Sequence, residues 1–315
     1  MIRVKNLTKY YGPTLAVDNI SFHVPKDEIV GFLGPNGAGK STTIRILTCY
    51  HPATSGYASV AGHDVFTQSM QVREKLGYLP ESTPLYQEMR VREYLDFRLK
   101  LRGVTRVDRP AMVKKAVDRV WLGDMMDRQI GHLSKGYRQR VGLAEAIMHE
   151  PAVIILDEPT IGLDPTQIRE TRSLIRDLAK SHTVMLSSHI LSEVEAVCDR
   201  VIIIAKGKIV ASGTPDKLRE KLTADSRLIA EIRGPNEDVV KTVGGIAGVH
   251  DVKIEQNDGW NRLKIDVDAK RDVREDLFTV TTQKGWALRE MRREVASLED
   301  FFVQITAQQQ ESRQD

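Results

Sequence analysis

The strongest constraint on how this chain can fold is one glycine-rich segment, Gly34-Pro35-Asn36-Gly37-Ala38-Gly39-Lys40-Ser41-Thr42. The apolar run before it, Ile29–Leu33, predicts a buried strand, and residues 43–47 after it predict a helix. A strand, a glycine-rich loop and a helix with Lys-Ser at the junction form a P-loop, whose backbone N–H groups and helix N-terminus face phosphate oxygens. The segment therefore predicts binding of a nucleoside triphosphate. The alternative, a glycine-rich turn that binds nothing, is disfavoured by the matched strand and helix.

Each residue type in this segment has an expected role. Gly34, Gly37 and Gly39 let the backbone curl around phosphates, because glycine adopts positive φ without strain. Lys40 is expected to reach the β- and γ-phosphates, and the Ser41 hydroxyl to bind Mg²⁺. The complete set of expected nucleotide contacts in the segment is Gly34, Asn36, Gly37, Ala38, Gly39, Lys40, Ser41 and Thr42.

Composition narrows the class of protein. A chain of 315 residues with a net charge of +3 and no long Lys/Arg block gives no reason to expect a nucleic-acid partner. Cys49 and Cys198 lack metal-ligand spacing and fit a reducing cytoplasm. The N-terminus does not read as a signal peptide, and the longest apolar runs, 153–156 and 201–205, are far shorter than the ~20 residues of a membrane span. We expect a cytoplasmic protein that relies on another chain for any membrane crossing.

A second segment, Val153-Ile154-Ile155-Leu156-Asp157-Glu158, predicts a buried strand that ends in two carboxylates. Charge at the carboxyl end of a strand lies where open α/β sheets bind ligands. We expect Asp157 to hold Mg²⁺, through water, and Glu158 to orient or deprotonate the attacking water. Two solvated carboxylates at a strand end are the alternative, and a P-loop, which requires such a carboxylate, argues against it.

Three further features are compatible with roles at a nucleotide site. The turn Leu133-Ser134-Lys135-Gly136 leads into a helix and offers a second anion-binding helix start, or simply an N-cap. His189 ends an apolar strand and could sense the γ-phosphate, although a histidine there is often structural. Tyr11, beside a turn, could stack on adenine or only pack at a strand end.

The order of predicted elements gives the fold class. Residues 1–222 read as an α/β P-loop domain with a mixed sheet, an antiparallel β subdomain and a helical subdomain at about 85–140. Residues 223–306 read as βαββαβ, a small α+β ferredoxin-like domain with a hairpin turn at Asn257-Asp258-Gly259. Ser297-Leu298-Glu299-Asp300 is expected to cap its last helix, and 307–315 to form a polar, disordered tail.

With these motifs in order, the first 222 residues resemble the ATP-binding subunit of an ABC transporter. The family's LSGGQ signature corresponds to Leu133-Ser134-Lys135-Gly136-Tyr137, its Walker B strand to 153–158, and the loop after it to Ile161-Gly162-Leu163-Asp164. His189 falls on the switch histidine, and Tyr11 on the aromatic residue that stacks on adenine.

The resemblance implies that two such domains, here two copies of this chain, dimerise head to tail. Each ATP, with Mg²⁺, then lies between one P-loop and the partner's Ser134 and Gly136, and Asp164 joins the nucleotide contacts. Glu158 and His189 are the implied catalytic residues. Hydrolysis would drive separate polytopic permease subunits, so the chain would lie on the cytoplasmic face of the membrane.

The sequence departs from the family pattern at two places. Glu81 replaces the Q-loop glutamine, and as a carboxylate it is a candidate ligand of Mg²⁺. Lys135 and Tyr137 replace the second glycine and the glutamine of LSGGQ. The LSKG form and the ending at 297–302 resemble the ABC-2 exporter branch, which includes drug-resistance and gliding-motility ATPases. The rival class, soluble ABC ATPases of translation or DNA repair, usually carries two ATPase domains or a long coiled coil, and this chain shows neither pattern.

Overall fold

The computed structural model describes residues 1–222, 225–268 and 271–294. The chain divides into two compact units, Met1–Thr214 and a second that begins at Pro215. The two units divide before the boundary expected at residue 222, because helix α8 (Pro215–Leu222) groups with the second unit.

The first unit is built on a six-stranded sheet in the order β10-β9-β3-β8-β7-β6. Every strand pairs in parallel except β10, which forms an antiparallel hairpin with β9. The central strands β3, β7 and β8 are buried along their whole length, as expected for strands covered on both faces. The strands are β3 (Ile29–Leu33), β6 (Leu76–Leu79), β7 (Val153–Asp157), β8 (Thr183–Ser188), β9 (Arg200–Ala205) and β10 (Lys208–Gly213).

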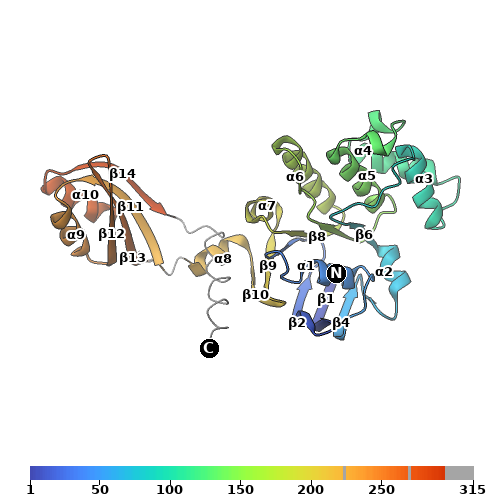
Figure 1. Ribbon diagram of the computed structural model, residues 1–315, viewed down its shortest axis with the longest axis horizontal. Coiled ribbons are helices and arrows are strands. Elements are labelled where there is room, and N and C mark those ends of the chain that lie inside the picture. Colours follow the sequence, from blue (N-terminus) through green and yellow to red (C-terminus); the bar gives the residue numbers. More distant parts are fainter. Residues whose placement is uncertain (223–224, 269–270, 295–315) are drawn as a thin grey trace. The chain divides into compact units, whose positions relative to one another are not determined.

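A second, antiparallel sheet has the order β2-β1-β4-β5. Its strands are β1 (Ile2–Tyr11), β2 (Thr14–Val24), β4 (Ser55–Val60) and β5 (His63–Asp64). Helix α1 (Lys40–Leu47) contacts β2 and β4 of this sheet and β7 of the other, so it lies between the two sheets (Figure 1). The β-type alternation seen in the first 30 residues is confirmed, with Ile2, Val4 and Leu7 buried on β1.

Helices complete the first unit (Figure 1). Helix α5 contacts β6, and α6 and α7 contact β8. The helical pattern expected after residue 85 is confirmed by α3 and α4, and Val91, Leu95 and Leu99 of α3 are buried. The helices are α2 (Ser69–Lys75), α3 (Val91–Leu101), α4 (Arg109–Arg119), α5 (Lys135–Ile147), α6 (Pro165–Ala179) and α7 (Leu191–Val197), with 3-10 turns at Gly123–Met125 and Ile130–His132.

The register of the parallel strands brings three carboxyl ends together. Leu33, the last residue of β3, pairs with Ser188 of β8, and Asp157, the last residue of β7, pairs with Ser187. The segments that follow these three strands are the P-loop, Glu158 and His189. The sheet therefore gathers at one edge the groups that the sequence placed far apart.

Gly31 in β3 shows how tightly the P-loop strand is held. A Cβ atom at this position would lie 2.3 Å from Val194 Cγ1 and 3.0 Å from Cys198 Sγ of the α7 segment. We expect Gly31→Ala to lower the free energy of unfolding by about 1–3 kcal/mol, because overpacking forces α7 off the strand. Urea denaturation measures the loss. Gly123→Ala is the control, since a Cβ there meets no atom within 4 Å; equal losses in the two variants would contradict the packing argument.

His149, just after α5, predicts a pH dependence of stability. Its Nε2–H donates to the Leu76 carbonyl oxygen (3.1 Å), and burial lowers its pKa to about 4, with a further contribution from Arg102. Below pH 6.5 the unfolded chain binds a proton here that the folded chain does not bind until about pH 4. The free energy of unfolding therefore falls as the pH drops through this window. His149→Gln should reduce the loss of unfolding free energy at low pH. It should not abolish the loss, because burial also lowers the pKa of His182. Urea titrations at several pH values test this, and an unchanged slope would count against it.

After α8, the second unit has the element order βαββαβ predicted from the sequence. Its antiparallel sheet has the order β12-β13-β11-β14, and the turn between β12 and β13 has Asp258 and Gly259 at φ 48° and 76°. Its elements are β11 (Asp225–Arg233), α9 (Asn236–Gly244), β12 (Val249–Asn257), β13 (Trp260–Asp268), α10 (Arg274–Gln283) and β14 (Ala287–Glu294). The predicted last helix at 297–306 and the tail from 307 lie outside the described residues.

Within the parts of the chain that the structure describes, every helix is too short or too polar to cross a bilayer.

Candidate active site

The P-loop joins β3 to α1 in a conformation that requires glycine. Gly37 and Gly39 have φ values of 77° and 105°. A Cβ on Gly34 would lie 2.4 Å from the Ile204 carbonyl oxygen, and one on Gly39 would lie 2.6 Å from that of Ala16. The loop curls around Lys40, whose Nζ donates to the Gly34 carbonyl oxygen at 2.7 Å. The positive φ expected at the three glycines is found at Gly37 and Gly39, whereas Gly34 is required by its close packing against Ile204.

A cavity of about 430 Å³ opens over this loop. It brings together Tyr11, the P-loop, Glu81, Glu158 and His189, all of which the sequence singled out. The predicted residues Ser134, Gly136 and Asp164 do not line it, nor do Gly34 and Asp157. The lining residues are Tyr11, Ala16, Pro35, Asn36, Gly37, Ala38, Gly39, Lys40, Ser41, Thr42, Glu81, Glu158, Ile161 and His189.

Glu158 is held between a cation and an imidazole. Its carboxylate is nearly buried, with Oε1 3.6 Å from Lys40 Nζ and Oε2 2.9 Å from His189 Nδ1. A carboxylate in this position can accept a proton, and the histidine ring fixes the direction of one of its oxygens. The contact between Glu158 and His189 was not predicted from the sequence, which assigned each residue a separate role.

Strand β7 ends at Asp157, one residue earlier than the sequence predicted. Glu158 has φ +50°, in the left-handed region that few residues other than glycine adopt. Its backbone N–H donates to Ser187, to the carbonyl oxygen at 3.2 Å and to Oγ at 3.1 Å. Glu158 therefore lies in the turn after β7, so its orientation relative to Asp157 is set by this turn.

Asp157 lies deeper than Glu158. Ser187 Oγ donates to its Oδ1 at 2.5 Å, and only 4% of the residue is exposed. Burial raises the pKa of Asp157 and the nearby carboxylates of Glu158 and Glu81 raise it further, against the lowering effect of the Ser187 hydrogen bond. This local excess of negative charge favours a bound cation.

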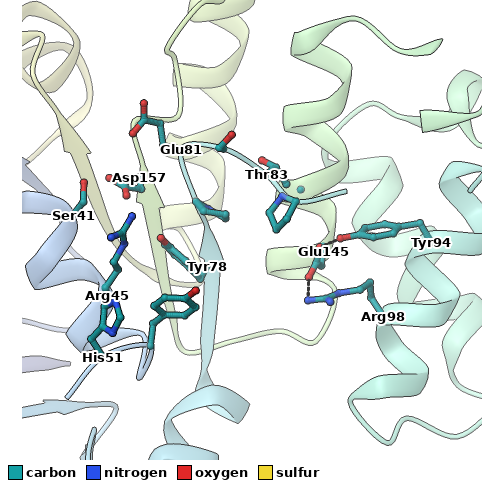
Figure 2. Close-up of a pocket in the computed structure, with 15 residues that line it drawn as sticks. Ser41, Arg45, His51, Tyr78, Glu81, Thr83, Tyr94, Arg98, Glu145 and Asp157 are labelled. Atoms are coloured by element: carbon teal, nitrogen blue, oxygen red, sulfur yellow. Dashed lines mark hydrogen bonds and ion pairs between the residues drawn. The ribbon is translucent and has the colours of Figure 1, made fainter. Parts of the chain in front are cut away.

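The side chains available to a cation are shown in Figure 2. Ser41, Glu81 and Asp157 line a second cavity, of about 620 Å³, next to the P-loop. A hydroxyl and two carboxylates are oxygen donors of the kind that Mg²⁺ prefers. In the described residues no group of three or more His, Cys, Asp or Glu side chains could hold a metal ion by itself. A Mg²⁺ ion here would therefore take its other ligands from phosphate and water, as is usual for nucleotide sites.

The signature segment and the loop after Glu158 contact each other within the chain. Ser134 is the N-cap of α5 and accepts from the Tyr137 N–H at 3.4 Å, an arrangement that leaves the predicted role in anion binding untested. Asp164 is the N-cap of α6 and accepts from Thr166 and Gln167 N–H groups at 2.9 Å. The Lys135 side chain crosses Gly162, since a Cβ on this glycine would lie 2.3 Å from Lys135 Nζ. Lys135, which departs from the family pattern, therefore packs against the loop that leads to Asp164.

Tyr11 lies at the margin of the cavity and is 40% exposed. Its ring meets the His51 ring edge-on with centroids 6.0 Å apart, and Lys9 Nζ lies 5.0 Å from its centroid.

Sequence reasoning missed Ser187. This serine contacts both acidic residues of the site: its Oγ donates to the Asp157 carboxylate, and its Oγ and carbonyl oxygen accept from the backbone N–H of Glu158. The sequence signal was present as Ser187-Ser188 directly before His189. Its meaning depends on the pairing of β7 with β8, which neither segment encodes alone.

Comparisons with known proteins agree with this geometry. The ABC transporter family model matches residues 17–161. The linearmycin resistance ATP-binding protein LnrL of Bacillus subtilis is 32% identical over 309 residues, covering 97% of this chain and 98% of that protein. The bacitracin transport ATP-binding protein BcrA of Bacillus licheniformis is 34% identical over 307 residues, covering 97% of each. A solved structure of the ATP-binding subunit of an ABC transporter is 29% identical with a TM-score of 0.65, covering 71% of this chain and 93% of that one.

The chain belongs to the ATP-binding subunits of ABC transporters. It binds ATP and is an ATPase of that family, as the P-loop, the paired carboxylates and the histidine at one sheet edge also indicate.

Proposed function

We propose that this chain hydrolyses ATP to power a multisubunit exporter of the ABC-2 type. The observation that carries the proposal is the convergence of the P-loop, Glu158 and His189 on one cavity. Two relatives matched along nearly the whole chain are named for linearmycin resistance and bacitracin transport, which supports export as the process.

The P-loop side chains and backbone would bind the triphosphate. The loop N–H groups and the α1 N-terminus would face its oxygens, and Lys40 would leave the Gly34 carbonyl for the β- and γ-phosphates. Tyr11 would stack on the adenine. Ser41 and Asp157, with Glu81, would hold Mg²⁺, which when bound neutralises phosphate charge.

Glu158 would then act on the attacking water. Nucleotide binding draws Lys40 towards phosphate, so Glu158 keeps His189 as its neighbour and gains a free oxygen, Oε1, for a water proton. His189, 36% exposed in its side chain, would contact the γ-phosphate from the same cavity.

The remaining predicted contacts would come from a second copy of the chain. Ser134 and Gly136 form a helix N-terminus suited to phosphate but lie outside the P-loop cavity. A head-to-tail homodimer would place them on the partner's ATP, and Asp164 beside the shared interface. Hydrolysis would reopen the dimer.

The partners follow from the same reasoning. Separate polytopic permease subunits would supply the membrane path and hold this chain at the cytoplasmic face. The surface after Glu81, near residues 84–94, would meet the permease. We propose that nucleic acid is not among the partners of this chain. Residues 1–222 would be the ATP-binding domain, and 223–306 an accessory domain.

Affinity purification of the tagged chain from detergent-solubilised membranes tests this function. We expect a polytopic membrane protein in fixed stoichiometry with the chain. Recovery of ribosomal or DNA-repair proteins, with no membrane partner, would support the soluble ABC ATPase class in its place and refute the exporter assignment.

A further inference from the structure

One buried carboxylate next to the active site has no role in the account given so far. Glu193 lies in the first turn of α7 and is 7% exposed. In the described parts of the chain, no basic side chain forms an ion pair with it. A buried carboxylate is costly unless hydrogen bonds satisfy it, so its partners indicate what it does.

The partners of Glu193 are two hydroxyl groups from different segments. Thr160 Oγ1 donates to Glu193 Oε2, and Thr160 is itself 6% exposed. Ser188 Oγ lies 3.3 Å from the same oxygen and accepts from the Ile190 N–H at 3.0 Å. One carboxylate oxygen therefore joins the segment after β7 to the segment after β8.

Both segments carry active-site groups. Thr160 is two residues after Glu158, and its carbonyl oxygen accepts from the Leu163 N–H at 3.2 Å in the loop that leads to Asp164. Ser188 directly precedes His189. None of Thr160, Ser188 and Glu193 lines the P-loop cavity, so their effect on a bound nucleotide must pass through their neighbours.

We propose that Glu193 is a positioning residue for ATP hydrolysis. By accepting hydrogen bonds from Thr160 and Ser188, Glu193 fixes the segment after β7 relative to the segment after β8. This keeps Glu158 Oε2 2.9 Å from His189 Nδ1 and fixes the loop that follows Glu158. The proposal rests on the proposed roles of Glu158 and His189.

Replacing Thr160 with valine tests this proposal most directly, because valine keeps the shape of the side chain and removes only the hydroxyl donor. We expect Thr160→Val to lower kcat for ATP hydrolysis about tenfold, the effect of one lost buried hydrogen bond on the reacting geometry. KM for ATP should change less than about twofold, since the P-loop is untouched. Thr160→Ser should restore kcat.

A pair of variants tests whether Thr160 acts through Glu193. Glu193→Ala should lower kcat by a similar factor, and adding Thr160→Val to it should lower kcat by less than about a further twofold, because the shared hydrogen bond is already gone.

The control variant removes a comparable buried hydroxyl, that of Thr183, at the end of β8 opposite to Ser188. Thr183 Oγ1 accepts from the Asp27 N–H at 3.0 Å, far from the carboxyl ends of the strands. Thr183→Val should lower the melting temperature and leave kcat unchanged. Thr160→Val with wild-type kcat, a failure of serine to restore it, or independent effects in the double variant would each overturn the role of Glu193. Glu158→Gln, assayed in the same experiment, tests the proposed function separately. Full turnover in Glu158→Gln would refute the role of Glu158 as the general base. The effect of Thr160→Val on kcat would still be measured against the wild-type chain.

Discussion

Replacing Glu158 with glutamine is expected to slow ATP hydrolysis by about 10²–10⁴-fold, the range typical for loss of a general base. The amide has nearly the same shape as the carboxylate and can keep a hydrogen bond to His189, so the site should stay folded. It cannot accept a proton from water. ATP affinity should not weaken, because Glu158 lies 3.6 Å from Lys40 Nζ, and removing its charge frees the lysine for phosphate.

Phosphate release under single-turnover conditions measures the chemical step in this variant directly. Glu255→Gln is a matched control, since Glu255 forms a surface ion pair with Lys264 in the second unit. Turnover within a few-fold of wild type in Glu158→Gln would remove Glu158 from the mechanism.

Replacing Lys40 with alanine is expected to weaken ATP binding by about 10–100-fold, the equivalent of losing one charged hydrogen bond to phosphate. Lys40 is buried, and its ammonium group is held by the Gly34 carbonyl oxygen (2.7 Å) and Glu158. These contacts are what phosphate oxygens would replace. Lys40→Arg should rescue little, because a planar guanidinium does not fit a cradle built around a compact ammonium group.

Equilibrium binding of a fluorescent ATP analogue gives the affinity independently of hydrolysis. Lys26→Ala is the control, because Lys26 is largely exposed and pairs with Asp27 at the surface. If Lys40→Ala binds the analogue as tightly as wild type, the P-loop assignment of this lysine is wrong.

Most of the fold was predictable because local patterns agreed with the tertiary result. The apolar runs at 29–33 and 153–156 became buried parallel strands, and the turn at 257–259 became a hairpin with two left-handed residues. Short-range signals decide such elements, since strand burial and turn chemistry are written in neighbouring residues.

What could not be predicted depended on pairing between distant segments. The contact of Ser187 with Asp157 requires the register of β7 against β8, and the 2.9 Å contact of Glu158 with His189 requires the left-handed turn at Glu158. Glu193 was not singled out from the sequence, because its partners Thr160 and Ser188 belong to two other segments. Sequence indicated the chemistry at each position, and tertiary pairing determined which groups meet.

Glu81 gives the site a charge that the family pattern lacks. It lines both cavities beside the P-loop and adds to the negative charge that raises the pKa of Asp157. Its position supports the hypothesis that a carboxylate can bind Mg²⁺ where the family has the Q-loop glutamine.

The molar mass of the Glu158→Gln chain in the presence and absence of ATP and Mg²⁺ is the most direct test of the central claim, that two copies enclose the nucleotide. Light scattering should show one chain without nucleotide and two with it. Ser134→Arg should prevent the doubling while ATP still binds, because Ser134 lies outside the P-loop cavity of its own chain. A chain that binds ATP and remains a single copy, or a Ser134→Arg variant that still doubles, would contradict the shared site.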